Sequence, residues 1–282
     1  MQKRPFGQPQ VNVGVIGQGT WNIDYDDWDM VVATLRRGID LGLTHIDTAE
    51  LYGDGVVEEM VAEAIKGRRD EVFLVSKVMP ENATRRGTSR ACERTLERLD
   101  TDHLDCYLLH WPEDDLNLDE TFEALDRLLR AGKVRSWGVS NFDVADLEAA
   151  LPYAGPGGLV CNQVLYHLRE RHIEHAVLPW CESHGVAVTT YSPFGHGRFP
   201  EPGHRGWDVL ARIGQAHGAT PRQVALGFLP RRPSVFAIPK SVTPEHTVEN
   251  AAAGDIRLAA AEIAEIDDAF PAGPPQRVLP ML

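Results

Sequence analysis

Short apolar segments alternate with longer amphipathic segments along the whole chain. The apolar segments are continuous, which is typical of strands buried on both faces. They cover residues 13–21, 44–49, 72–78, 104–110, 136–141, 159–167, 186–192 and 235–241. The amphipathic segments repeat their apolar residues at helical spacing, and they predict helices at 28–43, 56–65, 90–99, 122–131, 144–151, 173–184, 209–217 and 247–253. Good helix caps stand before three stretches of sequence: Asp143 before VADLEAA, Thr220 with Pro221 before RQVALGF, and Thr243 with Pro244 before EHTVENA.

This alternation predicts an α/β fold with a closed, parallel (β/α)8 TIM barrel, built as a single domain over residues 1–282. Two stretches rich in glycine and proline, 154–158 and 193–206, are expected to be loops. The second is either a mobile lid or an ordinary surface loop. In a barrel of this kind, the active site lies at the C-terminal ends of the strands.

Charge and cysteine spacing narrow the classes of function. The formal net charge of −13 disfavours nucleic acid as a partner, because an acidic chain repels phosphate backbones. The four cysteines have neither metal-ligand nor CxxC spacing, so we expect reduced thiols, no metal and a cytoplasmic location. No apolar run approaches the length of a bilayer span, and the first residues do not resemble a secretory signal. We expect a monomer that acts on a small molecule.

Lys77 is the most informative single residue. The chain has only five lysines, and this one stands at the end of an apolar strand. Other polar residues occupy equivalent strand ends or the positions just after them: Asp47, Tyr52, His110, Ser140, Asn141, Gln163, Tyr191 and Lys240. Because the ends of parallel strands meet at one face of a barrel, these residues predict one assembled site.

Asp47, Tyr52, Lys77 and His110 suit the protonation of an oxygen on which negative charge develops. The Lys77 ammonium is expected to lower the pKa of the Tyr52 phenol, and Asp47 would keep the lysine charged. His110 can donate a hydrogen bond to a carbonyl oxygen. Each residue also has a simpler interpretation: Asp47 as a helix cap, Tyr52 as a loop aromatic, and His110 as a satisfied strand-end histidine.

These residues and their surroundings resemble the aldo-keto reductases. The matching stretches lie between Gly17 and Asn250 and read GQGTW, HIDTAELYGDG, VSKV, LLHWP, GVSNF, CNQVLYH, YSPFG and IPKSVTPEHTVEN. The resemblance implies NADPH-dependent reduction of aldehydes and ketones, with NADH as a weaker alternative. It implies Tyr52 as general acid, Lys77 and Asp47 as the residues that tune its pKa, and His110 as the group that orients the carbonyl. It also implies a β-hairpin, up to about residue 16, that plugs the other end of the barrel.

The resemblance further implies the residues that bind the cofactor. Ser140, Asn141 and Gln163 would hold the nicotinamide carboxamide, and Tyr191 would stack beneath the ring. The remaining contacts would come from Gly19, Thr20, Trp21, Asp47, Ser192, Phe194, Gly195, Ile238, Lys240, Ser241, His246, Glu249 and Asn250. Lys240 and Ser241 would bind the 2′-phosphate. The family usually has arginine where this chain has His246, and histidine lacks the charged fork of arginine, so NADP preference should be weaker.

The substrate pocket would be lined by Trp21, Tyr52, His110 and Trp111. The stretch 110–140 is compact and the tail after Asn250 is short by the standards of the family, so we expect a broad, open pocket for small aldehydes. Two other functions remain possible: a non-catalytic, cofactor-binding regulatory barrel subunit, and a Rossmann-type dehydrogenase. The second is disfavoured because the glycines at 14, 17 and 19 do not form G-x-G-x-x-G.

Overall fold

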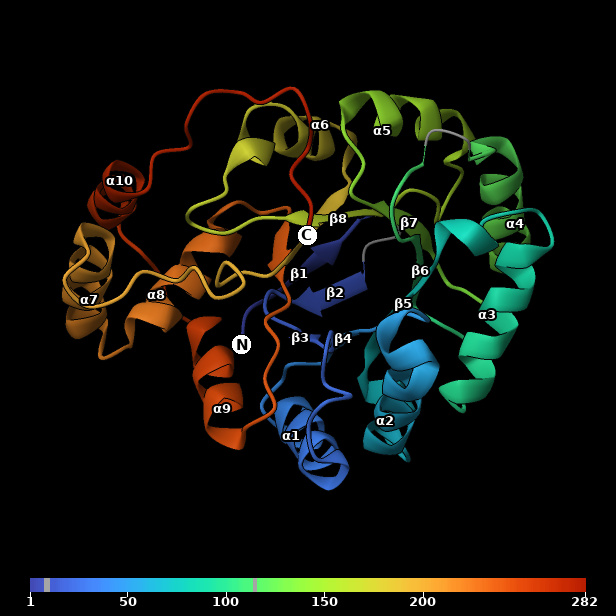
Figure 1. Cartoon of the computed structure of the whole chain (residues 1–282), viewed down its shortest axis with the longest axis horizontal. Coiled ribbons are helices and arrows are strands. Elements are labelled where there is room, and N and C mark those ends of the chain that lie inside the picture. Colours follow the sequence, from blue (N-terminus) through green and yellow to red (C-terminus); the bar gives the residue numbers. More distant parts are fainter. Residues whose placement is uncertain (8–10, 114–115) are drawn as a thin grey trace.

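A closed parallel barrel forms the centre of the molecule (Figure 1). The computed structural model describes residues 1–7, 11–113 and 116–282. Its eight-stranded sheet runs in chain order through β3 (Gln18–Gly19), β4 (His45–Asp47), β5 (Phe73–Val78), β6 (Cys106–Leu109), β7 (Trp137–Ser140), β8 (Cys161–Leu165), β9 (Ala187–Tyr191) and β10 (Val235–Ala237). The prediction of a (β/α)8 barrel is confirmed, and this strand order excludes the doubly wound sheet of a Rossmann dehydrogenase.

The backbone near Gly19 closes the barrel. The Gly17 amide donates to the Ala237 carbonyl at 2.8 Å, and the Gly19 amide donates to the Pro239 carbonyl at 3.1 Å. A Cβ atom at Gly19 would lie 2.6 Å from the Ile238 carbonyl oxygen, so only glycine allows this close approach. The first and last strands therefore meet without a gap.

Helices surround the barrel (Figure 1). They are α1 (Trp28–Asp40), α2 (Val56–Ile65), α3 (Gly87–Arg98), α4 (Leu118–Arg130), α5 (Val144–Ala150), α6 (Val177–His184), α7 (Arg205–His217), α8 (Pro221–Phe228), α9 (Pro244–Ala253) and α10 (Ala260–Ala269). The three predicted caps are confirmed, because the side chains of Asp143, Thr220 and Thr243 accept hydrogen bonds from backbone amides in the first turns of α5, α8 and α9.

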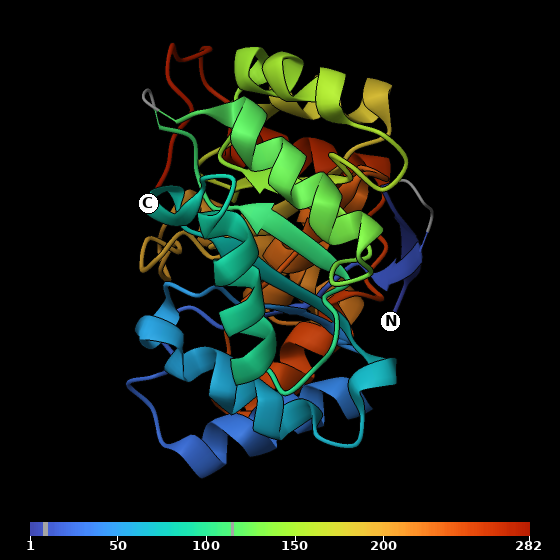
Figure 2. The same ribbon diagram turned by 90° about the vertical axis from the view of Figure 1, so that its right-hand side faces the viewer.

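An N-terminal hairpin plugs one end of the barrel, as expected. β1 (Lys3–Phe6) pairs antiparallel with β2 (Val11–Gly14). Phe6 and Val13 are buried in a cluster with inward-facing residues of the barrel strands. Figure 2 shows the N-terminus and the C-terminus on opposite sides of the molecule. Residues 8–10 of the expected hairpin lie outside the described residues.

Several predicted boundaries were wrong. The apolar segment 13–21 is two elements, because Val11–Gly14 pairs with the hairpin whereas Gln18–Gly19 joins the barrel. Some helices begin earlier than predicted: α4 begins at Leu118 and not at Phe122, because the Asn117 side chain accepts a hydrogen bond from the Glu120 amide. The segment 173–184 starts with a short 3-10 turn, and its α-helix begins only at residue 177.

The tail after Asn250 is more elaborate than expected. Helix α10 was not predicted, and beyond it the chain returns across the barrel mouth until Leu282 lines the same cavity as Tyr52. The tail thus forms part of the cavity wall on this side, and the expectation of an open pocket for small aldehydes stays a prediction. None of the helices described in the structure is long and apolar enough to cross a bilayer.

Candidate active site

A cavity of about 400 Å³ opens at the C-terminal ends of the strands. Asp47, Ser140 and Tyr191 are the last residues of β4, β7 and β9, which explains why positions distant in the chain meet here. The residues that line the cavity are Gly19, Thr20, Trp21, Asn22, Asp47, Leu51, Tyr52, His110, Trp111, Ser140, Asn141, Gln163, Tyr191, Ser192, Pro193, Phe194, His196, Gly197, Ile238, Lys240 and Leu282. The predicted convergence of the strand-end residues is thus observed.

The Lys77 ammonium lies directly beneath this cavity, with an exposed fraction of 0%. Its Nζ donates to Asp47 Oδ1 at 2.6 Å and to the hydroxyl oxygen of Tyr52 at 3.1 Å. A third hydrogen bond, of 2.9 Å, goes to the Thr48 carbonyl oxygen. All three donors of the ammonium are therefore used, and the phenol, the amine and the carboxylate form one continuous chain of hydrogen bonds.

The charge states of this chain follow from burial and pairing. Burial raises the pKa of Tyr52 above its ordinary value, and the Lys77 ammonium offsets only part of that increase. Lys77 lowers this pKa as expected, but the loss of water around the phenol has the larger effect, so the pKa of Tyr52 is not brought closer to neutrality. Burial alone would lower the pKa of Lys77, but Asp47 and Tyr52 together raise it above its ordinary value. At neutral pH the site thus holds a protonated phenol beside an ammonium.

His110 faces the same phenol. Its ring centre lies 5.8 Å from that of Tyr52, in an edge-to-face arrangement. Burial, with a smaller contribution from Lys77, holds the pKa of His110 well below its ordinary value, so the imidazole is neutral. Within the described part of the chain its buried Nδ1 atom has no hydrogen-bond partner, which disfavours the interpretation of a satisfied strand-end histidine.

Two side-chain amides border the site on its other side. Gln163 Nε2 donates to Asp47 Oδ2 at 2.7 Å. Asn141 Oδ1 accepts from the Tyr191 hydroxyl at 2.9 Å, and Asn141 Nδ2 donates to the His110 carbonyl oxygen at 3.2 Å. Burial raises the pKa of Tyr191 to about 12, so this hydroxyl is also protonated. Amides carry both donors and acceptors, which is the chemistry needed to bind a carboxamide such as that of nicotinamide.

Four residues other than glycine in the cavity wall have positive φ angles: Asn22, Asn141, Ser192 and His196. Asn141 has a φ angle of 61° and Ser192 one of 51°, and each directly follows a barrel strand. Such conformations are uncommon for residues other than glycine, and they tend to gather at functional sites. At both Asn141 and Ser192 the chain turns sharply at the mouth.

Some expected cofactor residues lie outside the cavity wall. Gly195, Ser241, His246, Glu249 and Asn250 do not line it. Ser241 donates its hydroxyl hydrogen bond to the Thr243 carbonyl oxygen at 2.9 Å, close to the start of α9. These positions extend away from the mouth toward α9, where the adenosine end of a dinucleotide was expected, so their roles stay predictions.

Sequence reasoning missed part of the wall. Asn22, Leu51 and Leu282 were not named as site residues, and Pro193, His196 and Gly197 were foreseen only as part of the 193–206 loop. The His196 ring stacks on Trp21 with 5.3 Å between ring centres. Asp26 was also missed: its carboxylate lies 3.2 Å from Lys240 Nζ, which also donates to the Asn22 carbonyl oxygen at 3.1 Å. Contacts between loops leave no periodic signal in a sequence.

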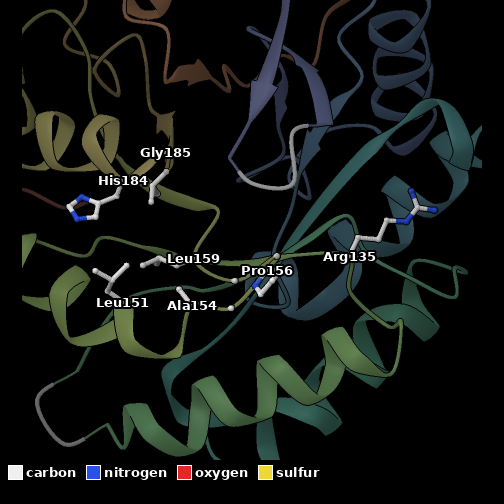
Figure 3. Close-up of a pocket in the computed structure, with 11 residues that line it drawn as sticks. Arg135, Leu151, Ala154, Pro156, Leu159, His184 and Gly185 are labelled. Atoms are coloured by element: carbon white, nitrogen blue, oxygen red, sulfur yellow. The ribbon is translucent and has the colours of Figure 1, made fainter.

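A second cavity, of about 480 Å³, lies at the opposite end of the strands (Figure 3). Its wall includes Arg135, which precedes β7, Leu159, which precedes β8, and Gly185, which follows α6. The Arg135 guanidinium already binds Asp105 at 3.3 Å. This cavity is slightly larger, but its wall contains no acid–base pair like Tyr52 and Lys77, so the smaller cavity is the candidate active site.

Comparisons with known proteins agree with this assignment. The sequence model of the Aldo/keto reductase family matches residues 15–270. The methylglyoxal reductase YeaE of Escherichia coli (strain K12) is 43% identical over 274 residues, which is 96% of this chain and 96% of that protein. A glyoxal reductase of Bacillus subtilis (strain 168) is 35% identical over 83% of this chain and 81% of its own length. A crystal structure of an aldo/keto reductase from Klebsiella pneumoniae in complex with NADP and acetate has a TM-score of 0.91 at 43% identity and covers 100% of both chains.

Proposed function

Because the chain belongs to the aldo-keto reductase family and is an NADPH-dependent carbonyl reductase, we propose that it reduces small aldehydes and dicarbonyl compounds with Tyr52 as the proton donor. The predicted family, enzyme class and cofactor are thereby confirmed. The observation that carries the residue assignment is the buried hydrogen-bond chain from Asp47 through Lys77 to Tyr52.

The cavity wall fits the reactive end of the cofactor. When bound, NADPH supplies the hydride that reduces the carbonyl carbon. Asn141 and Gln163 offer amide donors and acceptors to the carboxamide, Ser140 adds a hydroxyl, and the ring of Tyr191 forms a flat support. Further along the groove, Ser192 and Phe194 would border the pyrophosphate.

Tyr52 donates the proton to the carbonyl oxygen as negative charge develops there. Its phenol is protonated because burial raises its pKa. The Lys77 ammonium, 3.1 Å from the hydroxyl, stabilises the phenolate that remains after transfer. Asp47 keeps this ammonium charged and fixed in place. The pair thus favours a Tyr52 that holds its proton before the reaction and gives it up during the reaction.

His110 orients the carbonyl. Since the imidazole is neutral, it can donate one hydrogen bond without adding a charge. Its ring centre lies 5.8 Å from that of Tyr52, which supports a shared role for the two donors toward one carbonyl oxygen. A substrate oxygen between them would be aligned for proton transfer, which is the main contribution expected of a positioning group.

The proposed substrate class rests on the size of the cavity and on the relatives. A volume of about 400 Å³, shared with the nicotinamide end of the cofactor, leaves room for a small molecule. Trp21 and Trp111 give the mouth an aromatic border. Two relatives are named as methylglyoxal reductase and glyoxal reductase, and both names describe small dicarbonyl compounds. A non-catalytic regulatory role is disfavoured because the acid, the amine, the carboxylate and the imidazole are all present.

The decisive variant is Tyr52→Phe, which removes the acidic proton and leaves the ring. NADPH-dependent reduction of methylglyoxal should fall by at least about 10²-fold, the low end for general acid catalysis, while NADPH still quenches protein fluorescence. Tyr153→Phe is the matched control, because the Tyr153 hydroxyl donates to Asp119 outside the cavity. Turnover close to that of wild type in Tyr52→Phe would remove this residue from the role.

Three further expectations belong to the same proposal. The main hydrophobic cluster includes residues from Val15 to Leu279, which supports a single domain over residues 1–282. The four cysteines are free and buried, which is typical of a reducing compartment and supports the cytoplasm. We expect a monomer, and light scattering of the purified protein would test this through its mass.

A further inference from the structure

Arg222, in the first turn of α8, holds its guanidinium against the loop that borders the cavity. Its Cζ atom lies 5.2 Å from the centre of the Phe194 ring and 4.8 Å from the centre of the Phe199 ring. Phe194 itself lines the cavity. Two aromatic rings therefore restrain an arginine beside the cofactor groove.

The same turn of α8 contacts the helix expected to hold adenosine. Gln223, the next residue, donates from Nε2 to the Glu249 carbonyl oxygen at 3.0 Å. Glu249 lies on α9, one turn after His246, and Figure 1 shows α8 and α9 as neighbours. Arg222 thus stands where the cavity loop and the adenosine helix come together.

Charge distinguishes Arg222 from the other cations near this groove. Lys240 is partly neutralised by Asp26, whose carboxylate lies 3.2 Å away. His246 carries imidazole where the family has guanidinium. Within residues 1–7, 11–113 and 116–282, the Arg222 guanidinium has no carboxylate partner. In a chain of net charge −13, such an uncommitted cation is the natural partner of a phosphate.

We propose that Arg222 binds the 2′-phosphate at the adenosine end of NADPH and supplies the positive charge that His246 lacks. The inference rests on the proposed function, since it takes NADPH as the cofactor. A guanidinium binds phosphate through a planar fork of donors. Because the two phenylalanine rings already restrain the side chain, little further conformational freedom is lost on binding.

The test is a set of equilibrium titrations that do not depend on turnover. Binding of NADPH and NADH is followed by fluorescence, and binding of adenosine 2′,5′-bisphosphate is followed by displacement of NADPH. In Arg222→Gln, affinity for NADPH and for the bisphosphate should fall about tenfold, the effect of losing a charge-assisted contact. Affinity for NADH, which lacks the 2′-phosphate, should stay unchanged. Arg130→Gln is the control: Arg130 is 76% exposed on α4, and the net charge changes equally.

Arg222→Lys keeps the positive charge but removes the planar guanidinium, so its affinity for NADPH should lie between those of wild type and Arg222→Gln. Equal weakening of NADPH and NADH would overturn the proposal, because it would mean that Arg222 only supports the Phe194 loop. Unchanged binding of both cofactors would overturn it as well, because the side chain would then not reach the cofactor. A wild-type protein that binds neither cofactor would instead refute the proposed function itself.

Discussion

Replacing Lys77 by methionine tests the central electrostatic argument. The variant keeps the length of the side chain but removes the ammonium that binds Asp47 at 2.6 Å. Asp47 is only 1% exposed, so its carboxylate would remain buried with Gln163 as its one remaining side-chain partner in the described residues. Removing one partner of a buried ion pair costs about 3–5 kcal/mol, because the other charge is left uncompensated.

This loss should be visible in thermal unfolding. At about 2 °C for each kcal/mol in a domain of this size, the melting temperature of Lys77→Met should fall by roughly 6–10 °C. Lys133→Met is the matched control. Lys133 pairs with Glu93 at the surface, where both side chains are at least 37% exposed, so its loss should cost at most about 1 kcal/mol.

A double variant, Asp47→Asn with Lys77→Met, separates the charge from the packing. The double variant removes both charges, and the new amide at position 47 can still contact Gln163. It should therefore recover most of the stability that is lost in Lys77→Met. Carbonyl reduction should stay absent in both variants, because Tyr52 has lost the ammonium that stabilises its phenolate. If Lys77→Met melts at the wild-type temperature, the reasoning about the buried pair fails. If the double variant melts as low as Lys77→Met, the uncompensated carboxylate is not the cause.

Three further predictions concern histidines and the cofactor groove. Burial lowers the pKa of His45 to about 4 in the folded protein, whereas in the unfolded chain it is about 6.5. As pH falls from about 6.5 to about 4, the unfolded chain therefore binds a proton that the folded protein does not, and the folded state loses stability. His45→Phe should lose less stability than wild type over this pH range, measured by urea unfolding. An equal loss in both proteins would contradict this. His246→Arg should lower the KM for NADPH and leave the KM for NADH nearly unchanged. An equal decrease in both KM values would indicate that residue 246 acts by stacking on adenine. Asp26→Asn should tighten NADPH binding, because it releases Lys240 from the ion pair, and it should hardly change the melting temperature, because the pair is exposed. NADPH titrations at low and high salt measure the affinity; an affinity equal to that of wild type would mean that Asp26 does not restrain Lys240.

The sequence could predict the barrel and the four central residues for the same reason. Strand ends are local features, and the (β/α)8 topology brings all of them to one face. Asp47, Lys77 and His110 could therefore be grouped before any distance was known. Helix α10 was overlooked although Ile263, Ile266 and Phe270 follow at helical spacing. Its apolar stripe is short, and only Ile266 is buried among its ten residues.

The remaining features depend on balances and contacts that a sequence does not encode locally. The pKa of Tyr52 is raised by burial and lowered by the Lys77 charge, and the direction of the net shift depends on which effect is larger. Only the three-dimensional geometry determines this. The stacking of His196 on Trp21 joins residues 175 positions apart in two loops. Leu282 reaches the cavity at the end of residues 271–282, which form neither helix nor strand. Such contacts have neither period nor motif.

The burial of Lys77 also determines how the folded protein meets reagents that attack amines. With an exposed fraction of 0%, Lys77 is shielded from an acylating agent in the solvent. Lys240, whose side chain is 39% exposed, is accessible at the rim of the cofactor groove. Acylation of the native protein would therefore modify the groove proposed to hold the dinucleotide and spare the amine beneath Tyr52, so bound cofactor should protect the protein from inactivation.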